Sequence, residues 1–162
     1  MRRPAGEIQV RQDAASGHVS IVKVDLTSLK VIKDLNTTIF REDRIINTFD
    51  REDLMILLAL VDNVPAGFKI GYRENRFTYY SAKGGVLPEY RRQGLARKML
   101  YFMMAEARVR GYIRFAFDTF PNRDRGMTVL GLNEGFRVVK SDFNKTYKDW
   151  RLRFEKALGE SG

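Results

Sequence analysis

The segment from Gly84 to Leu100 constrains the fold of this chain more than any other. It reads Gly-Gly-Val-Leu-Pro-Glu-Tyr-Arg-Arg-Gln-Gly-Leu-Ala-Arg-Lys-Met-Leu, so a strand is expected to run into a glycine- and proline-containing turn and then into a helix. The first turn of a helix has backbone N–H groups without intrahelical partners, and these groups, with the helix dipole, favour an anion. Gly94 lets the backbone approach such an anion closely because it has no Cβ. The segment therefore predicts a strand–turn–helix unit that can hold a pyrophosphate.

The same segment is strongly basic. Its cations outnumber the single acidic residue Glu89, and they are Arg91, Arg92, Arg97 and Lys98. The whole chain has 29 Lys and Arg against 20 Asp and Glu, which gives a formal net charge of +9. This charge indicates an anionic partner, either nucleic acid, a membrane surface or a phosphorylated small molecule, and does not choose among them. The alternative interpretation is an ordinary strand-to-helix loop on a basic protein, because short motifs produce false positives.

Other features narrow the class of protein. With 162 residues, the chain is expected to form one domain over residues 18–162, preceded by a mobile N-terminal extension over residues 1–17. It has no Cys and only one His, His18, so disulfides and thiolate or histidine-cluster metal sites are excluded and no metal is predicted. No apolar run approaches the roughly 20 residues that span a bilayer, and no apolar core follows Arg2 and Arg3 as in a signal peptide. A cytoplasmic protein without a membrane segment is expected.

Hydrophobic periodicity predicts an α/β domain with the element order β-α-β-β-β-α-β-α-β-β. Runs of β-branched and aromatic residues indicate the strands, and apolar residues at helical spacing indicate the helices. The expected strands cover residues 18–25, 54–61, 66–72, 77–86, 113–119, 136–139 and about 146–156, and the expected helices cover about 29–40, 95–110 and 127–133.

Local patterns add detail to this order. Thr27 or Ser28 is expected to cap the first helix. The charged and apolar residues 41–46 indicate that this helix continues or that a second short helix follows. Strict alternation over residues 66–72 predicts a half-buried strand. The glycine pair beginning at Gly84 predicts a bulge or a splay at the end of the fourth strand.

A Val-x-Pro-x-Tyr-Arg-x-x-Gly-x-Ala pattern joins the fourth predicted strand to the long helix. Its residues are Val86, Pro88, Tyr90, Arg91, Gly94 and Ala96, and Asn122 and the pair Gly135-Phe136 follow downstream. Together with the element order, these residues resemble the GNAT superfamily of acetyl-CoA-dependent N-acetyltransferases over residues 19–156. The resemblance implies a mixed, mostly antiparallel central sheet, flanked by helices and splayed between the fourth and fifth strands. It also implies acetyl-CoA as acyl donor, with its pantetheine arm in the splayed gap.

The resemblance implies which residues hold this donor. Backbone groups of Val86 and Leu87 are expected to pair with the pantetheine amides, as an added strand does. The diphosphate is expected to meet backbone N–H groups of Gln93, Gly94, Leu95, Ala96 and Arg97. The remaining phosphate is expected to meet one of Arg91, Arg92, Arg97 and Lys98. Asn122 is expected either to contact the pantetheine arm or to cap the turn after a strand.

The chain departs from the family pattern at the positions that carry catalysis. Many members have a Tyr four residues before the Gly-Phe pair, where it protonates the leaving thiolate, but this chain has Gly131, and no Glu lies on the predicted fourth strand to serve as base. Direct attack by a neutral amine needs an aligned thioester and an oxyanion donor, such as the N–H of Val86 or Leu87. The catalytic candidates are Asp118, whose alternative role is to cap a turn or face solvent, and Tyr80, whose alternative role is packing.

The predicted function is transfer of an acetyl group from acetyl-CoA to a primary amine of a small molecule or peptide. The acceptor is expected to meet the first helix and residues 40–53, with Phe40, Arg41 and Arg44 at the cleft. These arginines suit an acceptor with a carboxylate or phosphate, or they form a solvated helix end. The alternative function is a non-catalytic basic module that binds nucleic acid or a protein partner, although no basic patch interleaved with aromatic residues favours nucleic acid. A homodimer is compatible with the resemblance, but no feature of the sequence predicts one.

Overall fold

The computed structural model describes residues 17–159, and its elements follow the predicted order. The strands are β1 (Val19–Val24), β2 (Met55–Val61), β3 (Val64–Arg73), β4 (Thr78–Val86), β5 (Arg114–Thr119), β6 (Arg137–Asn144) and β7 (Asp149–Ala157). The helices are α2 (Leu29–Phe40), α3 (Leu95–Val109) and α4 (Arg125–Asn133), with short 3-10 turns η1 (Leu26–Ser28) and η2 (Pro88–Tyr90). The predicted mobile extension over residues 1–17 lies, apart from Gly17, outside the described residues.

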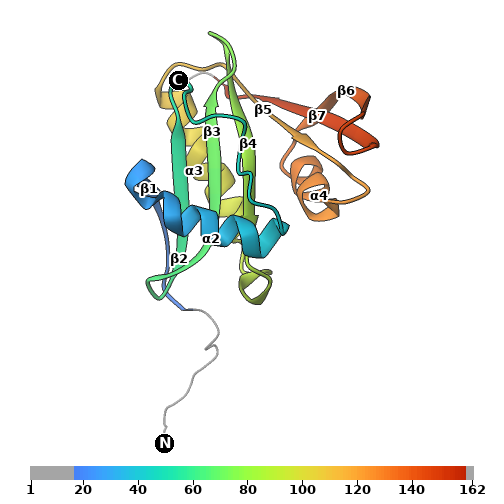
Figure 1. The fold of residues 1–162 in the computed structure, drawn as a ribbon. Helices are drawn as coiled ribbons and strands as arrows, with labels where there is room; N and C mark the ends of the chain where they lie inside the picture. Colours follow the sequence, from blue (N-terminus) through green and yellow to red (C-terminus); the bar gives the residue numbers. More distant parts are fainter. Residues whose placement is uncertain (1–16, 160–162) are drawn as a thin grey trace, which may run out of the picture.

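A single seven-stranded sheet forms the centre of the molecule, with the strand order β1-β2-β3-β4-β5-β7-β6. β4 and β5 pair in parallel and the other neighbours pair antiparallel. Helix α2 crosses one face over β2 to β4, whereas α3 and α4 cover the opposite face (Figure 1). The predicted mixed α/β fold is confirmed. Within residues 17–159, none of the helices has the length and apolar character needed to cross a membrane.

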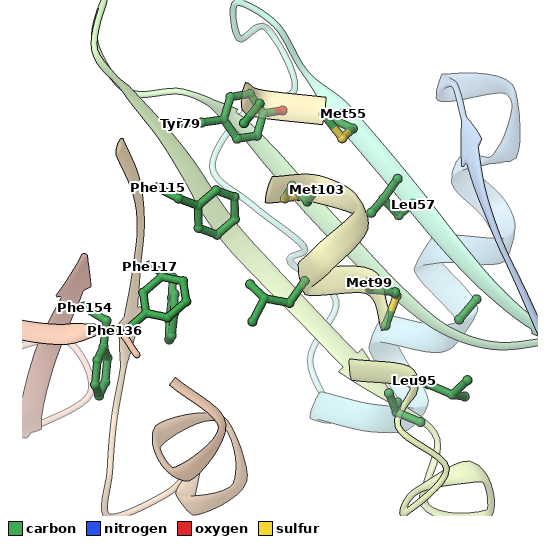
Figure 2. Close-up of a cluster of buried hydrophobic side chains, with 14 of the residues drawn as sticks. Met55, Leu57, Tyr79, Leu95, Met99, Met103, Phe115, Phe117, Phe136 and Phe154 are labelled. Carbon is green, nitrogen blue, oxygen red and sulfur yellow. The ribbon is translucent and has the colours of Figure 1, made fainter. Parts of the chain in front are cut away.

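Each face of the sheet carries its own apolar cluster. On the α2 face, Ile32 and Leu35 of the helix pack with Phe68 and Ile70 of β3. On the opposite face, the methionines of α3 lie over Leu57 of β2 (Figure 2). The same cluster continues under α4 as a group of aromatic rings from β5, from the residue before β6 and from β7: Phe115, Phe117, Phe136 and Phe154. Burying one such side chain contributes about 1.5–3 kcal/mol, so these two clusters hold both layers of helices on the sheet.

Several local expectations differ from the structure. β6 ends at Asn144, five residues beyond the predicted end at 139, because its polar second half pairs with β7. β3 is buried on both faces and is not half-buried, because α2 covers one face and α3 the other. Residues 41–53 contain no helix, since Arg41 ends α2 with a left-handed φ of 57° and the Asn36 amide then holds the chain by donating to the Glu42 carbonyl at 2.8 Å. Ser28 occupies the N-cap of α2 without a capping hydrogen bond from its side chain, and Asp25 instead accepts from the Thr27 N–H in η1.

The pairing between β4 and β5 ends halfway along β4. Their parallel pairing begins at Thr78 and ends where Ser81 lies opposite Phe117. The register of β4 against β3 shifts at the same point, because Ser81 and Lys83 pair with neighbouring residues of β3 and Ala82 is left over as a bulge. From Ala82 to Val86, β4 therefore follows β3 and diverges from β5, which leaves a gap (Figure 1). The predicted splay between the fourth and fifth strands is confirmed.

Candidate active site

The turn between β4 and α3, residues 87–94, presents open backbone at the start of a 15-residue helix. Arg92 and Gly94 adopt left-handed φ values of 66° and 76°. Gly94 is the N-cap of α3 and has no side chain to satisfy the first N–H groups of the helix. A Cβ placed on Gly94 would meet no protein atom within 4 Å, so the space over this backbone is open. The start of α3 thus offers unpaired N–H groups and the positive end of a helix dipole to an incoming group.

Val86, the last residue of β4, turns its backbone toward the gap. It lies opposite Gly67, and the hydrogen bond flanking this pair runs from the Leu87 N–H to the Ala66 carbonyl at 2.8 Å. The residues of such a non-hydrogen-bonded pair direct their own N–H and C=O groups away from each other's strand. The Val86 carbonyl accepts a hydrogen bond from Nε of Arg91 at 3.0 Å. The Val86 N–H therefore faces the gap, and Arg91 fixes the turn against the end of β4.

Leu87 cannot offer its backbone in the same way. Its N–H is donated to Ala66, and its C=O accepts from the Tyr90 N–H at 2.9 Å. Both groups predicted to pair with a pantetheine arm are thus already paired within the chain. Of the two predicted residues, Val86 alone presents a backbone N–H to the gap in this conformation.

The basic side chains around the turn are used differently. Arg97 forms an ion pair with Glu134 at the end of α4, with an N···O distance of 3.2 Å. Arg92 and Lys98 are exposed, and neither forms an ion pair with another described residue. Arg91 braces the turn through its Nε, as described above. Of the predicted phosphate-binding cations, Arg92 and Lys98 are accordingly the two whose charged group is neither paired nor hydrogen-bonded within the described residues. Gln93, in the turn, has a half-buried side chain, and Ala96, in the first turn of α3, has a short one.

The two predicted catalytic side chains, Tyr80 and Asp118, meet where β4 and β5 separate. Tyr80 lies opposite Ala116, one step before the last strand pair, and Asp118 is the first residue of β5 beyond that pair. The Tyr80 hydroxyl donates a hydrogen bond to Oδ2 of Asp118 at 2.5 Å. Burial raises the pKa of Tyr80, and the adjacent Asp118 charge raises it further. The phenol therefore stays protonated at neutral pH and serves as a donor to the carboxylate.

Asp118 also borders a polar pocket of about 100 Å³ on the open face of β5, β7 and β6. Arg151 and Asp142 pair across this pocket through two hydrogen bonds of 3.1 and 2.9 Å, which hold the pKa of Asp142 below its usual value. Arg153, opposite Asp118 in the sheet, is engaged by Glu74. Among residues 17–159, no cation pairs with the Asp118 carboxylate, which stays free to accept a proton or a positive group. The pocket is lined by Asp118, Lys140, Asp142, Arg151 and Arg153.

Asn122 lies in the loop after β5, on the far side of the gap. Its side-chain amide donates to Oδ1 of Asp149, the first residue of β7, at 2.9 Å. Asp149 also accepts from the Trp150 N–H at 2.8 Å. Asn122 thus ties the loop after β5 to the β6–β7 hairpin.

A model of the Acetyltransferase (GNAT) family matches residues 26–128. The chain belongs to this family. The predicted resemblance to the GNAT superfamily is confirmed, and so is the prediction that this protein is an acetyltransferase. The matched segment runs from η1 to the middle of α4, so it contains the splay, the turn before α3, and both Tyr80 and Asp118. No curated protein sequence matches the chain significantly.

Solved structures of other GNAT proteins have the same fold. The ribosomal-protein-S18-alanine N-acetyltransferase from Escherichia coli superposes with a TM-score of 0.76 at 16% identity, covering 90% of this chain and 97% of that one. A GNAT family acetyltransferase from Elizabethkingia anophelis with acetyl-CoA bound gives 0.74 at 16% identity, covering 86% and 97%. Arabidopsis thaliana Naa50, in complex with the bisubstrate analogue CoA-Ac-MVNAL, gives 0.72 at 18% identity, covering 85% and 97%. At such identities the likeness establishes the fold.

Within this GNAT fold, the predicted acceptor residues Phe40 and Arg41 have structural partners or face solvent. The Phe40 ring packs edge-on against Phe68 with centroids 6.3 Å apart, and the Lys83 ammonium lies 4.5 Å from its centroid. Arg41 caps α2 and is exposed. Phe40 therefore forms a wall beneath Lys83, while Arg41 stands at a solvated helix end.

Arg44 links two segments that are far apart in the sequence. Its guanidinium donates to the hydroxyl of Tyr147, in the β6–β7 turn, at 3.4 Å, and to Asn47 at 2.8 Å. Lys83 of β4 anchors the same segment by donating to Glu42 and to the Arg44 carbonyl at 2.7 and 2.9 Å. The segment after α2 and the β6–β7 turn thus meet over the α2 face of the splay. Sequence reasoning missed Tyr147, Lys83 and Glu42, because their contacts join positions 39 to 103 residues apart.

Gly131, which stands where many GNAT members have Tyr, is fixed by packing. A Cβ at this position would lie 2.8 Å from Cζ of Phe117. Phe117 is itself stacked on Phe154 at 5.2 Å and held edge-on by Phe136 at 4.9 Å, so its ring has no room to retreat. In this chain the aromatic core occupies the space that a side chain at position 131 would need.

This packing gives a prediction for two glycines of α4. Alanine in a helix interior is ordinarily more stable than glycine by up to about 1 kcal/mol. Gly126→Ala, in the first turn of α4, should show part of that gain, because nothing lies within 4 Å of its added Cβ. Gly131→Ala should instead lose roughly 1–3 kcal/mol, because the methyl group overlaps Phe117. Urea unfolding of both variants measures the difference, and equal stability would mean that the Phe117 ring yields.

Proposed function

We propose that this protein is an N-acetyltransferase that moves the acetyl group of acetyl-CoA to a primary amine. One observation carries the proposal: the open turn before α3 leads into the β4–β5 gap, and the gap closes at the Tyr80–Asp118 hydrogen bond. Three parts thus follow one another from the start of α3 along the gap: a turn for the phosphates, a channel for an extended arm, and the carboxylate of Asp118 on β5. We further propose that residues 18–162 act as one domain.

The donor is proposed to lie along this path. Its diphosphate would meet backbone N–H groups at the start of α3, from Gln93 to Arg97, where the open space over Gly94 permits close approach. Arg92 and Lys98, whose charges are uncommitted, would meet the remaining phosphate. The pantetheine arm would pair with the backbone of Val86, and the amide oxygen of Asn122 would face it from the other side of the gap.

The proposed chemistry is direct attack. The acceptor nitrogen adds to the thioester carbonyl, and the carbon–sulfur bond then breaks to release the CoA thiolate. Asp118 would take the proton that the nitrogen loses, while Tyr80 holds the carboxylate in place. The thiolate would be protonated from solvent, since Gly131 supplies no acid.

The acceptor is proposed to be an amine of a peptide or small molecule that enters over the α2 face. Two neighbours with the same fold support a peptide: one is named for the alanine of ribosomal protein S18, and another was crystallised with a CoA-peptide analogue. In this chain, Arg44 and Tyr147 would frame the entrance, and the free carboxylate of Asp118 would attract a cationic amine.

Calorimetry with acetyl-CoA and an assay of free thiol test this function. We expect saturable binding of acetyl-CoA and thiol release that depends on an added amine, screened over amines, amino acids, polyamines and peptides. Absence of binding at millimolar acetyl-CoA would refute the proposal. Binding without amine-dependent release, together with duplex binding that weakens steeply with salt, would favour the non-catalytic module suggested by the net charge of +9.

A further inference from the structure

Lys69 in β3 is a buried lysine with no bonded partner. Its side chain and backbone together are 5% exposed, and its ammonium makes no hydrogen bond or ion pair with any residue of the described range 17–159. Burial lowers the pKa of Lys69 to about 8, and the charge of Asp124 opposes this only in part. The tip of the ammonium still reaches solvent, because among residues 17–159 the fully buried side-chain polar atom without a partner is Oδ1 of Asn36. Burial of the rest of Lys69 reduces the hydration of this charge, so a group that pairs with it would be favoured.

The position of Lys69 connects it to the β4–β5 gap. Lys69 lies opposite Leu57 on one side and Gly84 on the other, so its side chain is on the α3 face of the sheet. Its stem passes over Gly84, since a Cβ there would lie 3.3 Å from Cγ of Lys69. Beyond Ser81, β4 has no pairing with β5, so the stem crosses β4 at the gap. Asp124, whose charge acts on the ammonium, is the N-cap of α4, on the other side of the gap.

The other surroundings of this ammonium are uncharged. Helix α3 turns Met99 and Met103 toward the sheet, and β5 turns Phe117 and Thr119 toward the same side. Among residues 17–159, Asp124 is the acidic group whose charge acts on this ammonium, and its carboxylate is already engaged as N-cap by the Met127 N–H at 3.1 Å. The space that Lys69 faces is the space proposed for the donor.

We propose that Lys69 is a donor-binding residue whose ammonium hydrogen-bonds a carbonyl oxygen of the pantetheine arm. The inference rests on the proposed function and adds a residue to it. Gly84 precedes Val86 by two residues, or about 7 Å along the strand, so the lysine and the Val86 N–H would contact successive parts of one extended arm. The arm offers amide carbonyls and no charge, which suits a donor with reduced hydration. The phosphates are held farther on, at the start of α3.

Lys69→Met tests this role because it removes the charge and keeps an unbranched apolar stem. We expect acetyl-CoA to bind roughly tenfold to a hundredfold more weakly, the effect of losing a hydrogen bond to a charged group. We also expect the unliganded variant to melt at a higher temperature than the wild type, because the unpaired charge is gone. The matched control is Lys30→Met on the exposed face of α2, where the lysine side chain is 84% exposed and neither quantity should change.

Two further measurements separate donor binding from a structural role. Adenosine 3′,5′-diphosphate lacks the pantetheine arm, so wild type and Lys69→Met should bind it equally. Wild-type affinity for acetyl-CoA should fall between pH 7 and pH 9 as the lysine loses its proton, and the affinity of Lys69→Met should not follow this trend. The pH range follows from the lowered pKa of about 8.

The outcomes distinguish this inference from the function on which it rests. If the wild type does not bind acetyl-CoA, the proposed function fails. If the wild type binds it and Lys69→Met binds it equally well, only the role of Lys69 fails. A variant that melts lower and loses affinity for both ligands would also overturn the inference, because it would assign Lys69 a structural role.

Discussion

Gly94→Glu is expected to weaken acetyl-CoA binding by roughly a hundredfold or more. The new side chain would occupy the open space over the start of α3 and place a negative charge where the diphosphate must approach. Two or more charge-assisted hydrogen bonds to backbone N–H groups would be lost, each worth about 1.5–3 kcal/mol. Isothermal calorimetry of the variant against the wild type measures the change. The effect should be the largest of any single substitution around the donor.

Gly111→Glu is the matched control, because it makes the same change at the other end of α3. Gly111 has a left-handed φ of 96° and, like Gly94, has nothing within 4 Å of an added Cβ. Each substitution should lower the free energy of unfolding by about 1–2 kcal/mol, the cost of a left-handed residue that is not glycine. Only Gly94→Glu should lose the donor. Equal acetyl-CoA affinity in the two variants would show that the donor does not bind at the start of α3.

The parts of this fold that sequence reasoning predicted are those governed by near neighbours in the chain. Most strands and helices follow from their own apolar period, whereas β6 continues to Asn144 through its pairing with β7, and the splay begins at Ala82, before the glycines that predicted it. Where the prediction failed, a distant element decided the outcome. β3 alternates like a half-buried strand, yet α2 and α3 cover both of its faces. Arg41 ends α2 in a conformation that its sequence does not signal.

The site divides in the same way. The turn before α3 is one continuous segment, so its shape was predictable from its glycines and arginines. The hydrogen bond from the Leu87 N–H to the Ala66 carbonyl could not be predicted, because it crosses to another strand. The meeting of Tyr80 with Asp118 spans 38 residues, and only the parallel pairing of β4 with β5 brings them together. Lys69 carried a signal in the sequence, since it is a charged residue between Gly67 and Gly71 on an apolar strand, but its burial depends on two helices.

Asp118→Asn is expected to lower kcat by about a hundredfold or more, the usual loss when a group that transfers a proton is removed. Asparagine keeps the shape and can still accept the hydrogen bond from Tyr80, but it cannot take a proton from the acceptor nitrogen. Acetyl-CoA affinity should stay unchanged, because Asp118 lies past the end of the proposed donor path. Steady-state kinetics at saturating donor, with calorimetry of acetyl-CoA binding, separates the two effects. Asp62→Asn in the β2–β3 turn is the control, since its φ of 51° suits asparagine and kcat should not change.

Tyr80→Phe distinguishes a carboxylate that works in the reaction from one that only completes a hydrogen bond. The variant keeps the ring and removes the donor to Asp118, so kcat should fall by roughly tenfold, the value of one hydrogen bond to a charged group. If Tyr80→Phe and Asp118→Asn both keep a kcat within twofold of the wild type, attack at the thioester proceeds without Asp118, and the proton leaves directly to water.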